Sequence, residues 1–315
     1  MRVHVPRSTP GPDRVPARLA ALAPVLERLA AEYEIAVRLP RDPVAFVWRY
    51  DDPADREIAA FCAAGLAFGR VASIMASVDG VLDVLGPRPA DAVRRLDVSR
   101  IRAALAPIVH RWIRGDDLAA LLLVLRALLR TWGSLEAAFL AGHDREASDV
   151  GPALTAFSRR AREVDVRAAY GGRRPSRAGV DYFFPSPAKG AACKRLNLFL
   201  RWMVRRGRID PGGWTGVAPS QLVVPLDTHV VRVARCLRLT TRRTPGWAMA
   251  SEITGALRQL APDDPVGFDF ALCHVGMLGQ CGDGTPRGAE GCPLSPACRP
   301  RVGRRRASPR PSVPR

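Results

Sequence analysis

Lysine is almost absent from this chain of 315 residues: only two of its 48 basic residues are lysines, and the others are arginines. The two lysines, Lys189 and Lys194, stand five positions apart. An arginine side chain stays protonated in proteins, whereas a lysine amine can lose its proton and act as a nucleophile or a base. A lysine kept against such a bias is therefore a candidate catalytic residue. The alternative is that such a lysine is present by chance or only forms a salt bridge.

Long hydrophobic runs are also missing, which excludes a membrane-spanning segment. The longest strongly apolar run covers residues 118–125, far short of the roughly 20 residues that a transmembrane helix needs. No apolar stretch of a secretory signal precedes the seven cysteines, and an odd number of unevenly spaced cysteines is typical of a reducing compartment. We therefore expect a cytoplasmic protein with free or metal-bound thiols and no membrane partner.

Alternating β patterns and internal repeats are absent as well, and helical periodicity covers almost the whole chain. The sequence therefore predicts an all-α fold. The expected helices cover residues 17–33, 53–69, 71–85, 98–112, 117–132, 135–141, 152–164 and 188–205, and others begin at Asp227, Trp247 and Pro265. Alanines and Gly65 dominate the middle of the second helix, which predicts close approach by a neighbouring helix or a ligand.

Positive charge is present in excess, with a net charge of +18. Residues 299–315 contribute +7 and residues 1–17 contribute +2, which leaves +9 on residues 18–298. This excess favours a polyanionic partner, because cationic side chains release the counterions condensed on phosphates. A GC-rich coding bias explains arginine in place of lysine, but not an excess of basic over acidic residues. We expect one folded unit over residues 18–298, flanked by disordered basic arms.

Two segments carry candidate chemistry. Lys194 stands near the start of a predicted helix, after a turn over residues 186–190 that offers free backbone N–H groups to a phosphate. Asp227 stands at an N-cap position, directly before an amphipathic stretch. The alternative for Asp227 is a plain helix cap, which stabilises a helix by about 1 kcal/mol and has no further role.

Together the two segments resemble the paired motifs of helix-hairpin-helix DNA glycosylases of the endonuclease III type, LPGVGxKTAN followed by VDTHxxRV. The stretch GAACKRLN matches the first motif at Gly190, Lys194 and Asn197, and LDTHVVRV, which contains Asp227, matches the second. The stretches CKRLNLFLRWMVR and PLDTHV also resemble a little-characterised bacterial family related to these glycosylases. This closer resemblance covers most of residues 40–280.

The resemblance implies a two-lobed helix-hairpin-helix fold, with the hairpin and active-site segment at residues 186–237. It implies a monomer that holds double-stranded DNA in the cleft between its lobes, in the nucleoid, and acts as a base-excision repair glycosylase with abasic-site lyase activity. Lys194 would attack the sugar and form an imine, and Asp227 would stabilise the positive charge that develops on the sugar. The resemblance further assigns DNA contacts to Lys189, Gly190, Arg195, His229 and Arg232.

Departures from the two motifs favour an alternative function. Ala188 and Lys189 replace the leucine and proline of the hairpin, and Ala192 replaces its second glycine. The two motifs lie farther apart than in the family, which fits a connector over residues 207–219 that loops out. The glutamine that the family inserts into DNA falls near Ala64 and Gly65. The alternative is a catalytically inactive DNA-structure-binding protein on the same scaffold, whereas an RNA-binding protein has only the charge in its favour.

Aromatic residues could stack on a base that has left the duplex, or they could simply pack in the core. The candidates are Phe68, Trp202 and Trp214.

Endonuclease III relatives often carry an iron–sulfur cluster with the spacing C-x6-C-x2-C-x5-C. The candidate ligands in the segment 281–298 are Cys281, Cys292 and Cys298. The last two match the final interval, but Ala289 occupies the position of the second cysteine. Cys273 or His274 could supply the fourth ligand. We weigh an iron–sulfur cluster or zinc ion equally against a loop of ordinary thiols, and the expected chemistry itself requires no cofactor.

Overall fold

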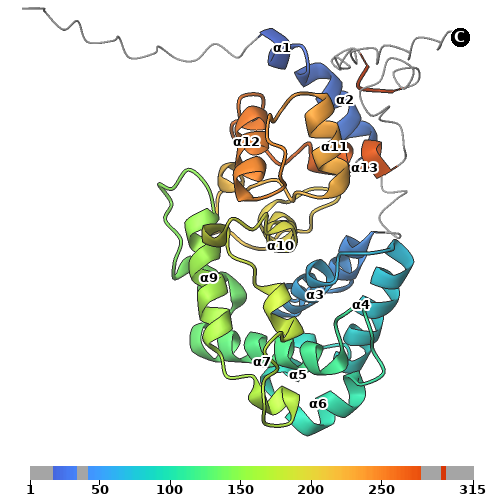
Figure 1. Ribbon diagram of the computed structural model, residues 1–315, viewed down its shortest axis with the longest axis vertical. Helices are drawn as coiled ribbons and strands as arrows, with labels where there is room; N and C mark the ends of the chain where they lie inside the picture. Colours follow the sequence, from blue (N-terminus) through green and yellow to red (C-terminus); the bar gives the residue numbers. More distant parts are fainter. Residues whose placement is uncertain (1–16, 34–41, 278–291, 296–315) are drawn as a thin grey trace, which may run out of the picture.

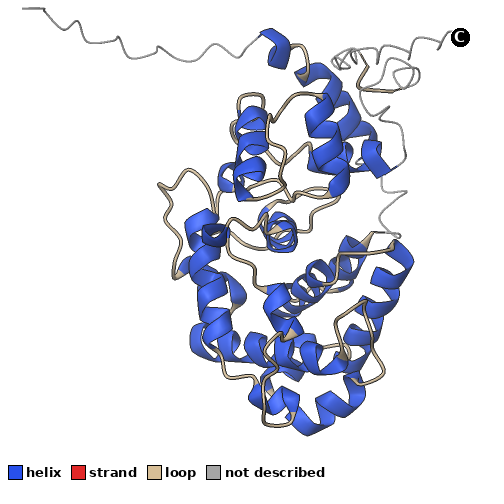
Figure 2. Ribbon diagram, in the orientation of Figure 1, coloured by secondary structure: helices blue, strands red, loops and turns tan. Residues whose placement is uncertain are grey.

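The computed structural model describes residues 17–33, 42–277 and 292–295. Every regular element in these ranges is a helix, apart from an isolated antiparallel bridge between His110 and Ile113 (Figure 2). The prediction of an all-α fold is therefore confirmed. The predicted arms at residues 1–17 and 299–315 lie outside the described residues, except for Ala17. In the described ranges, no helix combines the length and the apolar character needed to cross a membrane.

The described elements follow one another along the chain. The α-helices are α1 (Ala17–Ala20), α2 (Ala23–Tyr33), α3 (Pro53–Gly65), α4 (Val71–Leu85), α5 (Pro89–Arg94), α6 (Val98–Leu105), α7 (Gly115–Trp132), α8 (Leu135–Leu140), α9 (Gly151–Glu163), α10 (Lys194–Val204), α11 (Thr228–Cys236), α12 (Trp247–Arg258) and α13 (Asp269–Met277). The 3-10 helices are η2 (Pro43–Arg49), η3 (Arg167–Tyr170), η4 (Gly179–Phe183), η5 (Pro187–Lys189) and η6 (Pro219–Gln221).

Caps start several helices at the positions that the sequence predicts. The Oδ1 atom of Asp52 accepts hydrogen bonds from the backbone N–H groups of Ala54 (3.0 Å) and Asp55 (3.1 Å), and Pro53 occupies the first turn of α3. The hydroxyl of Ser134 caps α8 in a similar way. Local sequence is sufficient to begin these helices, because the cap satisfies N–H groups that have no partner within the helix.

Several helix boundaries differ from the prediction. α3 ends at Gly65 rather than at residue 69, and the predicted helix over residues 17–33 is divided into α1 and α2. α6 ends at Leu105 rather than at residue 112, because Pro107 follows and cannot continue a helix. α10 begins at Lys194 rather than at residue 188, because Cys193 has a left-handed backbone with φ of 51°. α13 begins at Asp269, four residues after the predicted start. The short helix α5 was not predicted.

The helices gather at two ends of the molecule. α3 to α8 lie at one end, α2 and α11 to α13 lie at the other, and α10 lies between them (Figure 1). α10 packs against α3, and α13 packs against both α11 and α2. A helix from the start of the chain therefore joins the last helices, and α10 connects this group to the rest of the protein.

The small side chains of α3 let α10 approach closely, which confirms the prediction of a close neighbour. Ala59, Ala60 and Ala63 of α3 are fully buried, and α3 and α10 are in contact. Phe61 of α3 packs edge-on against Phe199 of α10, with ring centroids 5.0 Å apart. Because protein interiors are closely packed, this contact holds α10 rigidly on the scaffold.

The segment that precedes α10 differs from the helix-hairpin-helix motif. Gly190 has a left-handed backbone with φ of 75°, as a hairpin glycine requires. However, the element before it is the single 3-10 turn η5, and the preceding α-helix, α9, ends at Glu163. The turn at Gly190 therefore joins a 3-10 turn, rather than a second α-helix, to α10.

The connector over residues 207–219 packs back onto the core, in contrast to the predicted loop. Ile209, Trp214 and Val217 are all buried. The indole Nε1 of Trp214 donates a hydrogen bond to Oε1 of Glu57 in α3 (2.7 Å). Three buried apolar side chains compensate for the entropy of ordering this segment.

Candidate active site

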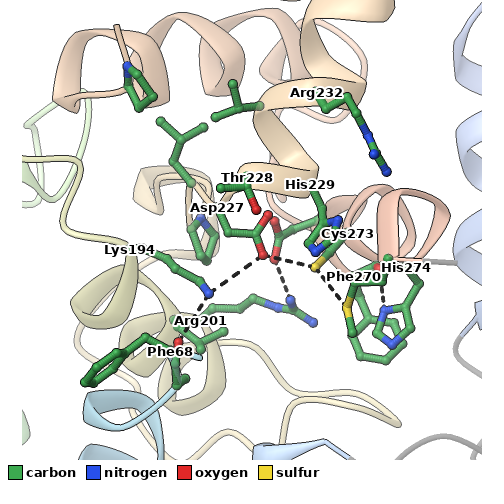
Figure 3. Close-up of a pocket in the computed structure, with 18 of the residues that line it drawn as sticks. Phe68, Lys194, Arg201, Asp227, Thr228, His229, Arg232, Phe270, Cys273 and His274 are labelled. Atoms are coloured by element: carbon green, nitrogen blue, oxygen red, sulfur yellow. Dashed lines mark hydrogen bonds and ion pairs between the residues drawn. The ribbon is translucent and has the colours of Figure 1, made fainter. Parts of the chain in front are cut away.

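Lys194 and Asp227 lie together in the wall of a pocket. The Nζ atom of Lys194 is 3.7 Å from Oδ2 of Asp227, although 33 positions separate the two residues in the sequence (Figure 3). Their side chains are 32% and 15% exposed. The structure thus brings together the two residues that the sequence singled out as nucleophile and carboxylate.

Helix ends hold both side chains in place. Asp227 is the N-cap of α11, and its Oδ1 accepts a hydrogen bond from the backbone N–H of Val230 (2.8 Å). The second oxygen, Oδ2, is thereby left to face the pocket. Lys194 is the first residue of α10, and its Nζ also donates a hydrogen bond to the carbonyl of Ala67 (3.3 Å). Asp227 therefore acts as a cap, and its other oxygen remains available for chemistry.

A thiol also contacts the Asp227 carboxylate. The Sγ atom of Cys273 in α13 donates a hydrogen bond to Oδ2 of Asp227 (3.3 Å). Burial raises the pKa of Cys273 well above its usual value, and the negative charge of Asp227 adds to this effect. The thiol is therefore protonated at neutral pH and acts as a hydrogen-bond donor. The sequence contained no signal for this contact, since a lone cysteine in a helix has no distinctive spacing.

A buried ion-pair network lies beside the pocket. Arg201 of α10, whose side chain is 3% exposed, pairs with Asp210 of the connector (3.2 Å) and with Asp269 of α13 (2.6 Å). Burial raises the pKa of Asp269 to about 6, and the nearby Asp227 carboxylate acts in the same direction while Arg201 opposes it. The network ties three segments that surround the site, and it places a second carboxylate near Asp227.

The pocket has a volume of about 1330 Å³, larger than the roughly 300–1,000 Å³ of common small-molecule sites. It is bounded by α10, α11, α13 and the start of α4. Apolar and aromatic side chains form part of its wall: Phe68, Ile74, Leu198, Trp202, Val231 and Phe270. A cavity of this size with apolar walls can accept a nucleotide.

Cations outnumber acids in the pocket wall. Among the described residues the cations are Lys194, Arg201, Arg232, Arg235, Arg238, Arg242 and Arg243, and the acids are Asp42, Asp227 and Asp269. Four of the arginines, on the last turn of α11 and the loop after it, are exposed: Arg235, Arg238, Arg242 and Arg243. We call these four residues the arginine rim. The rim was not predicted, although the run TTRRT was its visible signal in the sequence.

His229 and Arg232, predicted as DNA contacts, both line the pocket. The guanidinium of Arg232 donates to the carbonyl of Gly276 in α13. His229 packs against the same glycine so closely that an added Cβ there would lie 2.7 Å from the His229 Cβ. Both residues therefore hold α11 against α13 as well as facing the pocket.

Lys189 and Gly190 do not line the pocket, although both are exposed. The carbonyl of Gly190 accepts a hydrogen bond from the backbone N–H of Trp247 (3.1 Å), so the turn is attached to the start of α12. These residues stay available to a long ligand that extends beyond the pocket.

Arg195 is placed in the interior, which corrects its assignment as a DNA contact. The residue is 8% exposed, and its guanidinium donates to the carbonyls of Gly65 (3.3 Å) and Tyr182. Burial lowers the pKa of Arg195 to about 10, so it remains charged at neutral pH. Its partners are backbone carbonyls, and the structure gives it the role of joining α10 to the ends of α3 and η4.

The three aromatic candidates differ in their positions. Phe68 is half-buried and lines the pocket, and Trp202 also lines it although only 2% of Trp202 is exposed. Trp214 is buried and donates a hydrogen bond to Glu57, so it packs in the core and is not available to stack on a base.

Two of the predicted metal ligands, Cys281 and Cys298, lie outside the described residues. Cys292 is buried, and Cys273 lies against Asp227. In the part of the chain that the structure describes, no group of three or more histidine, cysteine or acidic side chains has an arrangement that could hold a metal ion. Because two of the proposed ligands are not among the described residues, the metal site stays a prediction, and the described contact of Cys273 is its hydrogen bond to Asp227.

Comparison with known proteins gives a family match. The model of a protein family described as "Protein of unknown function (DUF2400)" matches residues 42–278, which include every pocket residue named above. No curated protein and no solved structure matches the chain.

Proposed function

The chain belongs to the DUF2400 family, and from the geometry of its pocket we propose that it is a DNA glycosylase with abasic-site lyase activity. The observation that carries the proposal is the 3.7 Å approach of the Lys194 amine to the Asp227 carboxylate in the wall of a basic pocket. An amine and a carboxylate at this separation can act on the same sugar carbon. The family description names no activity, so the proposal depends on the site.

DNA is the substrate that the charge of the pocket favours. The arginine rim can neutralise the phosphates that flank a nucleotide, with release of counterions. A base must leave the stack to reach Lys194, which costs a few kcal/mol and costs least for a damaged or mismatched base. Phe68 and Phe270 offer apolar faces to the extruded base. In this proposal the groups of helices at the two ends of the molecule are the two lobes that hold the duplex.

The reaction follows from the two groups. Asp227 stabilises the positive charge that develops on the sugar as the glycosidic bond lengthens. The Lys194 ammonium gives a proton to the departing base, and the freed lone pair forms a bond to C1′ while the base leaves with the electrons of the glycosidic bond. Loss of a proton from nitrogen and opening of the sugar ring give an imine. β-Elimination of the 3′ phosphate then breaks the strand, with no metal or oxidant required.

A catalytically inactive DNA-structure-binding protein is the second candidate. The observation that favours it is the 3-10 turn at η5, which replaces the first α-helix of the hairpin. In addition, Ala64 and Gly65 are buried in α3, so the position of the inserted glutamine carries no side chain that reaches DNA. This candidate keeps the basic pocket and predicts binding without chemistry.

Borohydride trapping on a duplex with an abasic site separates the two candidates. Reduction of the imine leaves a covalent protein–DNA adduct, which we expect with the native protein and not with Lys194→Ala. Lys189→Ala is the matched control, because it removes the only other lysine, which is exposed and does not line the pocket. An adduct that persists in Lys194→Ala, or binding without any adduct, contradicts the enzymatic proposal.

Asp227→Asn tests the carboxylate. Asparagine keeps a good N-cap for α11, so the fold is expected to survive while base release falls by several orders of magnitude. Base release is measured on a panel of duplexes that carry uracil, oxidised or alkylated bases, which also identifies the preferred lesion. Turnover by Asp227→Asn at the native rate would exclude the proposed role.

A further inference from the structure

A tight turn beside the pocket presents an aromatic side chain to solvent. The backbones of His110 and Ile113 are joined by two hydrogen bonds, of 3.0 Å and 2.9 Å, and Arg111 at the tip has a left-handed φ of 56°. Trp112 at the same tip is 49% exposed. Large aromatic side chains usually bury most of their surface, so a half-exposed tryptophan on an ordered turn needs a physical reason.

The turn is rigidly attached to the protein. His110 is 1% exposed, and its ring nitrogens lie 2.9 Å from the Ser77 hydroxyl and 2.8 Å from the carbonyl of Phe68. Its ring also packs edge-on against the Phe68 ring, with centroids 4.5 Å apart. Three contacts of His110 thus fix the exposed tip. A ligand that binds the tip therefore removes little conformational entropy from the protein.

The indole ring of Trp112 contacts two aromatic rings and the Arg111 guanidinium, which lies 5.4 Å from the indole ring centroid. It packs against Phe68 and Tyr182, each with ring centroids 5.0 Å away, and the Arg195 guanidinium lies 3.3 Å from the Tyr182 ring centroid. Arg195, which the sequence analysis assigned to DNA, therefore supports this aromatic group from the interior. Because the residue is still 49% exposed, part of the indole surface is accessible to a planar ligand.

The aromatic group is continuous with the candidate active site. Phe68 lines the pocket, and the carbonyl of the preceding Ala67 accepts the hydrogen bond from Lys194. Arg111 and Arg114 beside Trp112 are both exposed, and among the described residues neither forms an ion pair with an acidic side chain. The indole is therefore adjacent to the site and is flanked by unneutralised positive charge.

We propose that Trp112 stacks on a base of the bound nucleic-acid strand next to the nucleotide that enters the pocket, and that Arg111 contacts the neighbouring phosphate. The proposal rests on the proposed function, because it assumes that a strand passes the pocket. Stacking on a base uses the open indole surface, and the two exposed arginines favour the negative charge of the backbone.

The experiment compares binding by Trp112→Ala, Trp112→Phe and Trp48→Ala. Trp48 is the matched control, because it is similarly exposed, at 44%, and its indole is held by Ile209 rather than by the Phe68 group. The probe is a duplex with a reduced abasic-site analogue and the fluorescent base 2-aminopurine beside it. We expect Trp112→Ala to weaken binding about 5- to 100-fold and to relieve quenching of 2-aminopurine, while Trp112→Phe stays within about threefold of the native protein.

Arg111→Ala is expected to lower the slope of log affinity against log salt by about one, and Trp112→Ala is expected to leave that slope unchanged. Thermal unfolding of each variant shows whether the turn is intact. If Trp112→Ala folds, binds and quenches like the native protein while borohydride trapping still succeeds, this inference fails alone. If trapping fails but the Trp112 effect remains, only the enzymatic proposal fails. Binding to none of these duplexes overturns both.

Discussion

The thiol of Cys273 lies 3.3 Å from Oδ2 of Asp227, the same oxygen that lies 3.7 Å from the amine of Lys194. One carboxylate oxygen is therefore shared between a neutral donor and a cation. Because the raised pKa keeps the thiol protonated, Cys273 orients the carboxylate without competing for the amine. This shared oxygen makes Cys273 a positioning residue in the proposed reaction.

Replacement of Cys273 tests that role. We expect Cys273→Ala to slow base release by about tenfold or less, since it removes one hydrogen bond from a charged acceptor. Cys273→Ser is expected to recover most of the rate, because serine keeps a donor at this position. Single-turnover rates measured across a range of pH check the prediction. Equal rates for Cys273→Ala and the native protein would show that the contact has no part in positioning.

The raised pKa of Asp269 predicts a pH-dependent contribution to stability. The carboxyl is protonated more readily in the folded protein, with a pKa of about 6 against 3.8 for the free side chain. Its contribution is therefore present below pH 4 and is lost as the pH rises through 6. The loss is on the order of 3 kcal/mol.

Urea unfolding of the native protein and Asp269→Asn, at intervals from pH 4 to pH 8, measures this contribution. The free energy of unfolding of the native protein should fall relative to that of the variant as the pH rises. A difference between the two that is independent of pH would contradict the prediction.

A glycine in α13 permits the close packing that positions Asp227. An added Cβ at Gly276 would lie 2.7 Å from the Cβ and 3.1 Å from the Cα of His229, so one helix would have to move. We expect Gly276→Ala to destabilise the protein by about 1–3 kcal/mol and to reduce base release. Gly255→Ala in α12 is the matched control, since an added Cβ there meets nothing within 4 Å.

The control is expected to be neutral or stabilising by up to about 1 kcal/mol, because alanine favours a helix more than glycine does. Thermal unfolding and base release are measured for both variants. Equal stability of Gly276→Ala and Gly255→Ala would show that α11 and α13 can separate freely.

The Glu57 carboxylate joins α3 to α8 and to the connector by accepting three hydrogen bonds. Its carboxylate accepts hydrogen bonds from the backbone N–H groups of Leu135 (2.8 Å) and Glu136 (2.9 Å) and from the indole of Trp214 (2.7 Å). Glu57→Gln replaces one acceptor oxygen by an NH₂ group that faces donors. We expect a loss of about 1–3 kcal/mol in the free energy of unfolding.

Glu57 does not line the pocket, so the borohydride adduct per folded molecule should not change. Urea unfolding and trapping measured on the same preparation test both parts. Unchanged stability of Glu57→Gln would show that the three hydrogen bonds contribute little to the fold.

Local sequence predicted much of the secondary structure and the two central residues. Caps such as Asp52 and Asp227 depend only on nearby backbone N–H groups, and the apolar stripes follow the period of the helix. The wrong boundaries at α6 and α10 have local causes as well. The proline after α6 was visible in the sequence, but the left-handed backbone of Cys193 was not, because cysteine has no preference for that conformation.

By itself the sequence determined that the protein is helical, that it is strongly basic, and that one lysine and one aspartate stand at helix starts. Only the tertiary structure decided that these two side chains meet, that Cys273 and Asp269 join them, that Arg195 is buried and that Trp112 is exposed beside the pocket. Helix periodicity and caps are interactions over a few residues, whereas these contacts join segments up to 130 positions apart. Their meeting depends on how whole helices pack, and packing is decided by the shape of the complete core.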